Sequence, residues 1–231
     1  MKGGVGIGPY KVGETAGSAE LAEDQGFDYI GIPDSQSLWH ELYLSLSIVA
    51  NATKKVCLGP MVTNPLTRHP AVSASAIATL NEISHGRAFL GIGSGDSAIL
   101  NLGLRPAKMG DTREYIRALR SILSGQTYEY NGRPIHVQWS ETPVPIVMSA
   151  EGPKTLAMAG GIADAVIVHS GLTGDVLADT VARIREGERT AGRPEGSAEV
   201  WAFAQCNISD KREDAVDEIK MALAASGHHA F

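Results

Sequence analysis

Two carboxylates follow short apolar runs and stand among small residues. Asp34 ends the run "FDYIGIPDS", and Asp96 lies in "GIGSGDS". A carboxylate at the end of a strand can accept hydrogen bonds from a ligand or exchange a proton with it. The same position also suits the N-cap of a following helix. The sequence therefore supports two interpretations of Asp34 and Asp96, as catalytic groups or as helix caps.

Small and polar residues also follow other apolar runs, where glycines and backbone N–H groups would let a phosphate or carboxylate group of a ligand come close. These further candidates for ligand binding are Thr63, Asn64, Gly93, Gly95, Ser97, Ser149, Ala150, Glu151, Gly152, Pro153 and His169. The glycine-rich run is a poor match to a dinucleotide fingerprint, because it belongs to the fourth predicted strand and Asp96 interrupts the pattern. The histidines show no HxxH spacing, so no metal site is expected.

The elements that must position these residues alternate along the whole chain. Strands, in several cases together with the loop that follows, are predicted within 5–8, 27–35, 56–70, 87–97, 144–153, 163–171 and 198–209. Helices are predicted at 14–25, 41–52, 71–83, 111–123, 153–160, 174–190 and 211–225. An irregular insertion at about 125–143 contains Asn131-Gly132, which is typical of a hairpin turn.

Seven successive strand–helix units predict an α/β fold with a parallel sheet covered by helices. The strands lack polar alternation, as expected when both faces are buried. A (β/α)₈ barrel and a doubly wound open sheet both fit this pattern. A barrel needs eight strands, so either the sheet is open or the chain is a fragment of a longer protein.

Composition narrows the possible partners. The chain has 231 residues, a net charge of −6 and no basic block, so neither nucleic acid nor an anionic membrane is an expected partner. No apolar stretch is long enough to span a membrane. The two cysteines, Cys57 and Cys206, lie in apolar runs and are expected to be buried free thiols, which suits the reducing cytoplasm.

Four stretches together resemble the luciferase-like monooxygenase superfamily, and within it the coenzyme F420-dependent, methylenetetrahydromethanopterin reductase-like branch. They are "DSQSLWHELY", "LGPMVTNPLTRHP", "GIGSGDSAILNLGLRPA" and "PVPIVMSAEGPKTLAMAGGIADAVIV". The resemblance implies a single (β/α)₈ TIM-barrel domain over 1–231 that lacks its eighth strand and helix. It also implies a bound coenzyme F420 or FMN.

The same resemblance implies roles for individual residues. Strand three of the family carries a non-proline cis peptide behind the cofactor ring, which by position is Met61–Val62, with Thr63 and Asn64 at the ring edge. Asp34 and Asp96 match acidic residues near the ring, and 149–153 matches the loop on the phosphate side. Two departures are visible in the sequence. Ser35 stands where several relatives have a histidine, and Gly6 or Gly8 stands where the reductase has a glutamate.

The expected function is therefore hydride transfer between coenzyme F420 and a small organic substrate. One alternative is an FMN-dependent monooxygenase that uses oxygen and a separate flavin reductase. Another is a cofactor-binding member without catalytic activity, which the two departures would suit. A doubly wound NAD enzyme is disfavoured, because the first strand carries no fingerprint. The resemblance further implies a homodimer formed through barrel helices.

Overall fold

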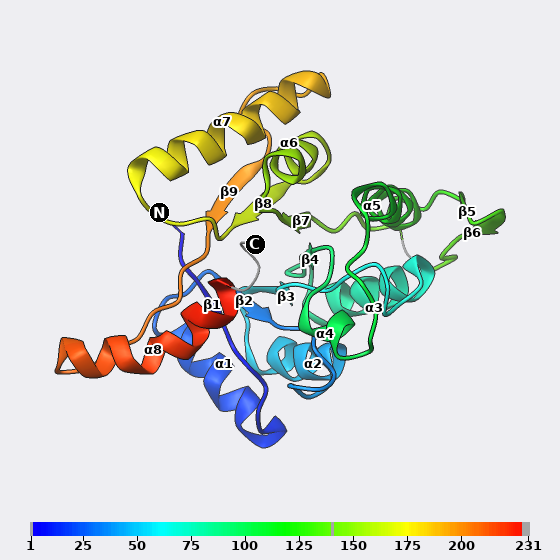
Figure 1. Cartoon of the computed structure of the whole chain (residues 1–231). Coiled ribbons are helices and arrows are strands. Elements are labelled where there is room, and N and C mark those ends of the chain that lie inside the picture. Colours follow the sequence, from blue (N-terminus) through cyan, green and yellow to red (C-terminus); the bar gives the residue numbers. More distant parts are fainter. Residues whose placement is uncertain (1, 140, 228–231) are drawn as a thin grey trace.

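The computed structural model describes residues 2–139 and 141–227, in which short parallel strands are surrounded by helices (Figure 1). The parallel strands are β1 (Gly4–Gly6), β2 (Tyr29–Ile32), β3 (Cys57–Pro60), β4 (Leu90–Ile92), β7 (Ile146–Ser149), β8 (Ala165–Val168) and β9 (Glu199–Ala202). They are neighbours in chain order, as βα units dictate. One sheet has the order β1-β2-β3 and the other β4-β7-β8-β9. Isolated bridges, Leu58 to Ala88 and Thr63 to Ile92, join the two.

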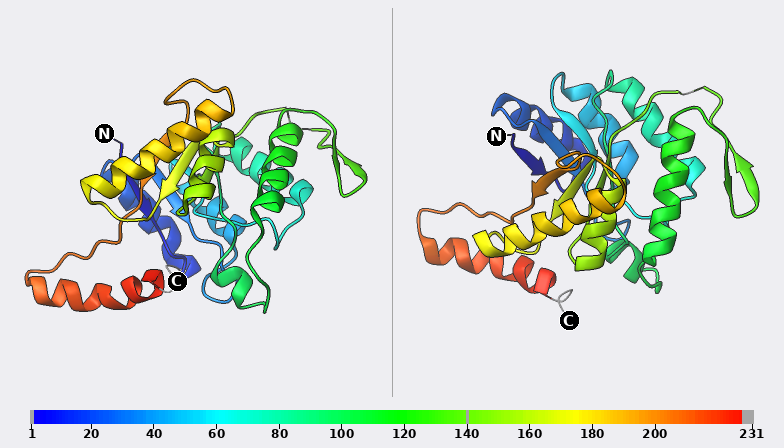
Figure 2. Two further views of the ribbon diagram at one scale, coloured as in Figure 1. Left: turned by 45° about the horizontal axis from the view of Figure 1, so that its top comes forward. Right: turned by 90° about the horizontal axis from the view of Figure 1, so that it is seen from above.

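Helices cover the outside of these strands (Figure 1). They are α1 (Thr15–Asp24), α2 (Leu42–Ala52), α3 (Pro70–Ile83), α5 (Met109–Leu123), α6 (Pro153–Ile162) and α7 (Gly174–Thr190), with the short η1 (Val12–Glu14) and α4 (Ser97–Leu100) in connections. The last helix, α8 (Arg212–Gly227), follows an extended segment and lies outside this ring (Figure 2). None of the helices in the described ranges is both long and apolar enough to cross a membrane.

Successive strand residues point to opposite faces and so build two apolar layers. Ile30, Leu58 and Leu90 belong to the larger core packed against the helices. Tyr29, Phe89 and Trp201 belong to a smaller inner cluster. The Tyr29 and Trp201 rings are 4.6 Å apart, and those of Phe89 and Trp201 are 5.4 Å apart. Aromatic side chains therefore connect the first half of the barrel to β9, although β1 and β9 share no strand pairing in the described residues.

The predicted elements are largely confirmed. Helices begin and end within two residues of the predicted limits, and α3 and α6 both begin at a proline. The predicted insertion contains the antiparallel hairpin of β5 (Tyr128–Tyr130) and β6 (Arg133–Ile135). Asn131 and Gly132 have φ values of 51° and 72°, as a type I′ turn requires.

Three predictions need correction, two on strand limits and one on the burial of the cysteines. The first strand is Gly4–Gly6 rather than 5–8, because its pairing with β2 ends at Gly6. The seventh predicted strand ends at Ala202 instead of continuing to Ser209, since pairing with β8 stops there. The chain then leaves the barrel, so Cys206 is exposed, while Cys57 is only half-buried. Both thiols are free, as predicted, but neither is fully buried.

Candidate functional site

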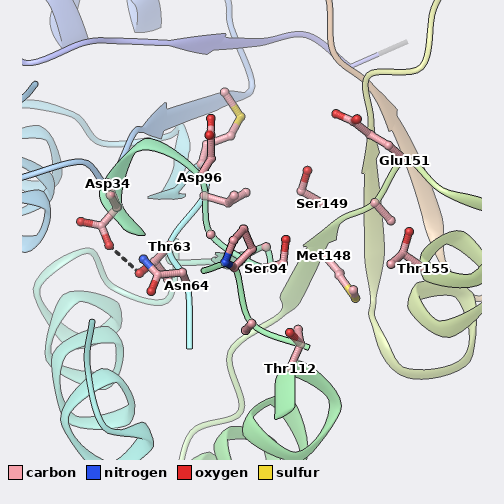
Figure 3. Close-up of a pocket in the computed structure, with 18 of the residues that line it drawn as sticks. Asp34, Thr63, Asn64, Ser94, Asp96, Thr112, Met148, Ser149, Glu151 and Thr155 are labelled. Atoms are coloured by element: carbon pink, nitrogen blue, oxygen red, sulfur yellow. Dashed lines mark hydrogen bonds between the residues drawn. The ribbon is translucent and has the colours of Figure 1, made fainter. Parts of the chain in front are cut away.

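A cavity of about 710 Å³ opens at the carboxyl ends of the strands (Figure 3). All of the predicted site residues line it except Pro153, which lies in a neighbouring cavity of about 300 Å³. Those that line the larger cavity are Asp34, Met61, Val62, Thr63, Asn64, Gly93, Gly95, Asp96, Ser97, Ser149, Ala150, Glu151, Gly152 and His169. Parallel strands place their carboxyl ends at one edge, so residues far apart in sequence converge there.

Other lining residues were missed by the sequence reasoning. They are Pro33, Ser35, Trp39, Ser94, Ala98, Pro106, Ala107, Met109, Thr112, Met148, Thr155, Met158 and Gln205. Thr155 and Met158 lie about one turn apart on α6, and Met109 and Thr112 begin α5. The helical spacing of Thr155 and Met158 on α6 is a sequence signal from which these two lining residues could have been predicted. Gln205 carries no such signal, because it lies in the irregular segment after β9.

The backbone at the end of β3 lies close to that of β4. A Cβ atom at Gly59 would collide with the carbonyl oxygen of Phe89, and one at Gly91 would collide with that of Pro60. Glycine therefore allows the backbones of β3 and β4 to approach closely. The peptide bond between Met61 and Val62 is cis, as predicted. Both of these residues line the cavity immediately beyond the close approach.

Asp34 belongs to a buried polar network at the end of β2. Its Oδ2 accepts hydrogen bonds from Thr63 Oγ1 at 2.6 Å and from Arg68 Nη1 at 2.6 Å (Figure 3 shows the Thr63 bond). The Asp34 side chain is 6% exposed and that of Arg68 is 18% exposed. The helix that follows β2 is capped by Glu41, whose Oε2 accepts from the N–H of Leu44. The N-cap interpretation is therefore wrong for Asp34.

Arg68 is held from several sides. Its Nη2 donates to Glu41 Oε1 at 2.9 Å, and its guanidinium lies 5.3 Å from the centre of the Tyr43 ring. Burial acts to lower the pKa of Arg68, but the hydrogen bond and charge of Asp34 outweigh burial and raise it. Burial raises the pKa of Tyr43, so its phenol stays neutral. The next residue, His69, caps α3 by accepting from the N–H of Ala71.

The loops after β2 and β4 are tied to each other across one side of the cavity. Ser97 Oγ donates to Ser35 Oγ at 3.0 Å, and Gln36 Nε2 donates to the carbonyl of Ala98 at 2.8 Å. Asp96 occupies the N-cap position of α4 and lines the cavity. Its backbone carbonyl accepts from the N–H of Ile99 at 2.8 Å. This helical turn positions Asp96 at the cavity, across from Ser149 and Glu151 (Figure 3).

The wall formed by β7, β8 and the segment after β9 is more open. Glu151 is 51% exposed at its side chain and His169 is 28% exposed, with His169 Nδ1 3.9 Å from Glu151 Oε1. The Phe203 ring packs edge-on against His169 at 5.0 Å. The buried Oε1 atom of Gln205 has no hydrogen-bond partner among the described residues. Because a buried carbonyl oxygen without a partner is costly, this atom suits a hydrogen-bond donor on a ligand.

Trp39 closes the cavity next to β1. A Cβ atom at Gly8 would lie 2.5 Å from Cζ3 of the Trp39 indole. The Tyr10 ring packs against Trp39 with centroids 4.4 Å apart. The indole therefore fills the space beside Gly8. Within the described part of the chain, no group of three or more histidine, cysteine or acidic residues could hold a metal ion.

These features define an α/β barrel with a ligand cavity at the carboxyl ends of its strands. A family model described as "Luciferase-like monooxygenase" matches residues 2–230, and the chain belongs to this family. The predicted resemblance and the luciferase-like TIM-barrel fold are thereby confirmed.

Curated relatives agree with this assignment. The chain is 38% identical to 5,10-methylenetetrahydromethanopterin reductase of Methanolobus tindarius, over 84% of the chain and 60% of the relative. It is 34% identical to the reductase of Archaeoglobus fulgidus, over 89% of the chain and 63% of the relative. It is 33% identical to an F420-dependent glucose-6-phosphate dehydrogenase of Kineococcus radiotolerans, over 80% of the chain and 60% of the relative. The chain thus spans less than two thirds of these relatives.

Solved structures show the same fold. The coenzyme F420-dependent tetrahydromethanopterin reductase of Methanopyrus kandleri superposes with a TM-score of 0.85 at 30% identity, covering 97% of this chain and 71% of that one. An F420-dependent secondary alcohol dehydrogenase in complex with an F420–acetone adduct has a TM-score of 0.83 at 21% identity, covering 95% and 74%. The second likeness concerns the fold alone.

Proposed function

We propose that the chain is the cofactor-binding part of a coenzyme F420-dependent oxidoreductase that acts on a small organic substrate. The observation that carries the proposal is the cavity at the carboxyl ends of the strands, in a chain 38% identical to an F420-dependent type of reductase. Its volume of about 710 Å³ is within the usual range for cofactor and ligand pockets.

The residues at the cavity fit such a cofactor. The segment from Ser149 to Gly152 leads directly into α6, whose N-terminal N–H groups suit a phosphate. The buried Gln205 Oε1 would accept a hydrogen bond from a ring N–H. Val62 lies against Gly93, and both residues line the cavity.

When bound, the deazaflavin would supply a hydride donor or acceptor. The chain's own residues would bind and orient it, and would hold or supply the proton that accompanies hydride transfer. Asp34 and Asp96 are the proposed catalytic carboxylates. Asp34, which is ion-paired with Arg68, would accept hydrogen bonds, whereas Asp96 would exchange the proton. The hydroxyl of Ser35 would not donate a proton at neutral pH.

An FMN-dependent monooxygenase with a separate flavin reductase is the second candidate. The family description and a structural neighbour in complex with FMN, a Baeyer–Villiger monooxygenase of 21% identity, support it. A cofactor-binding member without turnover is the third. All three share the cavity, so they differ in which cofactor binds and in whether the bound cofactor reacts with a substrate.

Titration of the purified chain with coenzyme F420 and, separately, with FMN distinguishes these candidates. We expect saturable F420 binding, followed by its fluorescence. A Gly93→Val substitution should weaken this binding at least about tenfold, because its side chain would project against Val62 and Ser149. Gly13→Ala, where a Cβ meets nothing within 4 Å, is the control. Binding of FMN alone would favour the monooxygenase, F420 binding without turnover across an acceptor panel would favour the third candidate, and binding of neither would refute the proposal.

We further propose that the protein forms a homodimer through barrel helices and works in the cytoplasm. The neighbouring helices α2 and α3 expose Leu44 at 69% and Val72 at 55%, which supports self-association through this face. The two free cysteines suit a reducing compartment. Light scattering of native protein and of Leu44→Glu tests the dimer, which the substitution should dissociate.

A further inference from the structure

We infer that Arg68 is a positioning residue of this site, which holds Asp34 as an ionised hydrogen-bond acceptor at the cavity wall. Arg68 does not itself line the cavity. Its contacts with Asp34 stand without any ligand, and only the identity of the ligand rests on the function proposed above.

The hydrogen bonds at Asp34 have a definite direction. Oδ2 of Asp34 receives the Thr63 hydroxyl hydrogen and one Arg68 N–H, each at 2.6 Å between heavy atoms. Nη2 of Arg68 lies 3.4 Å from the other oxygen, Oδ1. Because Thr63 gives its hydrogen to Asp34, its own oxygen can only accept from a further group. A ligand group that contacts Asp34 or Thr63 therefore meets an acceptor and must itself be an N–H or O–H donor.

Arg68 is anchored independently of Asp34. It donates to Glu41 at the start of α2, and its backbone carbonyl accepts from the Tyr115 hydroxyl at 2.9 Å. The Tyr115 hydroxyl also shares a hydrogen bond with Ser73 at 2.7 Å. Glu41 therefore holds the guanidinium, and Tyr115 holds the backbone of residue 68. This anchoring is what fixes the geometry of a carboxylate that is 6% exposed.

The charges around Asp34 make Arg68 decisive. The groups that face Asp34 are Glu41 at the N-cap of α2, Tyr43 on α2 and Tyr115 on α5. Burial raises the pKa of Tyr43, and it raises the pKa of Tyr115 to about 12, so both phenols stay neutral. Glu41 carries a negative charge, which would disfavour a second negative charge on Asp34. The positive charge that offsets both carboxylates comes from Arg68, and without it a carboxylate this little exposed takes up a proton.

A proton titration of Asp34 in the ligand-free chain tests the inference directly. Carboxyl carbons of aspartate are labelled with ¹³C, and the Asp34 signal is assigned by its loss in Asp34→Asn. In Arg68→Met, Asp34 should protonate at a pH about one to three units higher than in the native chain. Arg120→Met breaks a solvent-exposed pair with Asp164 and should leave the signal unchanged. An unchanged Asp34 titration in folded Arg68→Met would overturn the inference.

A merely structural role for Arg68 is separated by a double variant. In Arg68→Met, F420 binding should weaken as the pH falls through the range in which Asp34 of that variant takes up a proton, by up to about tenfold per unit. Adding Asp34→Asn should remove that pH dependence, whereas a general packing defect would leave it in place. If the native chain binds neither F420 nor FMN, the proposed function fails, and the ¹³C titration still decides the role of Arg68.

Arg68→Lys keeps the inference testable if the methionine variant does not fold. Lysine retains the charge but cannot reach Asp34 and Glu41 together in a fork geometry. The Asp34 titration should then stay within about one pH unit of native. A larger rise would show that charge at residue 68 does not keep Asp34 ionised.

Discussion

The two halves of the barrel, β1–β4 and β7–β9, are held alike at the amino ends of their strands and differently at the carboxyl ends. In the first half, Glu23 on α1 accepts from the N–H groups of Lys54, Lys55 and Val56, just before β3. In the second, Glu188 on α7 accepts from the N–H groups of Gly196 and Ala198, just before β9. In each half, one carboxylate on a helix thus fixes the backbone just before a strand, which we call the strand entrance.

At the carboxyl ends of their strands, the two halves differ. The wall of the first half is an internally bonded network in which Asp34, Thr63 and Arg68 satisfy one another. The wall of the second half has exposed groups such as Glu151, and an oxygen at Gln205 that has no partner in the part of the chain that the structure describes. The first wall is therefore formed before a ligand arrives, and the second has hydrogen bonds left to make. Rigid positioning and ligand contact are divided between the two sides of one cavity.

The largest expected effect concerns catalysis across the cavity. Replacing Asp34 and Asp96 together by asparagine should abolish turnover with F420 and an accepted substrate, a loss of roughly 10²–10⁴-fold, because general acid–base assistance is removed. Asp210→Asn, at an exposed site, serves as the control. Native turnover in both single variants would contradict a catalytic role for either carboxylate.

The comparison of strand entrances predicts the next largest effect. Glu188 is fully buried and also pairs with Arg185 at 2.7 Å. Glu188→Ala should lower the free energy of unfolding by about 3 kcal/mol, since it leaves buried N–H groups and a cation without partners. Glu23→Ala, at a half-buried site, should lower the free energy of unfolding by a smaller amount. Urea denaturation of both variants measures the difference, and the reverse order would break the comparison.

Acid should weaken the contacts of Glu23 and Glu188 at the two strand entrances. Burial acts to raise the pKa of Glu23 and of Glu188, but hydrogen bonds from backbone N–H groups, together with Arg87 or Arg185, outweigh it and lower both from 4.5. A lowered carboxyl pKa stabilises the fold above the unfolded value and loses this contribution as pH falls below it. Stability should therefore decline from about pH 4.5 downward, and Glu188→Gln should flatten that decline. An equally steep decline in the variant would contradict this assignment.

The smallest effects should separate the two cavity walls. Gln205→Ala should weaken F420 binding roughly fivefold and leave Tm unchanged, because its oxygen has no hydrogen-bond partner among residues 2–139 and 141–227. Thr63→Val should instead lower the free energy of unfolding by about 1 kcal/mol, because it removes a hydrogen bond to buried Asp34. Fluorescence titration and thermal melts measure both. If Gln205→Ala lowered Tm as much as Thr63→Val, the walls would not differ as described.

Local signals in the sequence predicted much of the fold. Pro70 and Pro153 mark helix starts, and Asn131-Gly132 marks the hairpin, because each residue type favours those backbone angles directly. Residues as distant as Asp34 and His169 could be assigned to one cavity because parallel strands share an edge. These inferences need no knowledge of side-chain packing.

Other features depend on tertiary contacts that no local pattern encodes. The ion pair of Asp34 and Arg68 joins side chains from two different loops, and Arg68 had no signal beyond its place in "TRHP". Gln205 and Cys206 continue an apolar run in sequence, yet the strand ends at Ala202 where its pairing with β8 ends. An apolar run indicates burial of its members but does not say where the chain turns away.

The contact between Gly8 and Trp39 imposes an order on any change to this end of the barrel. A side chain at residue 8 would meet the indole at once, so the tryptophan must first become smaller or turn away. The pairing of Trp39 with Tyr10 makes that turn harder. An acidic group could therefore be introduced at residue 8 only along a path that changes residue 39 beforehand. For protein engineers and for natural selection alike, the change at residue 39 has to come first.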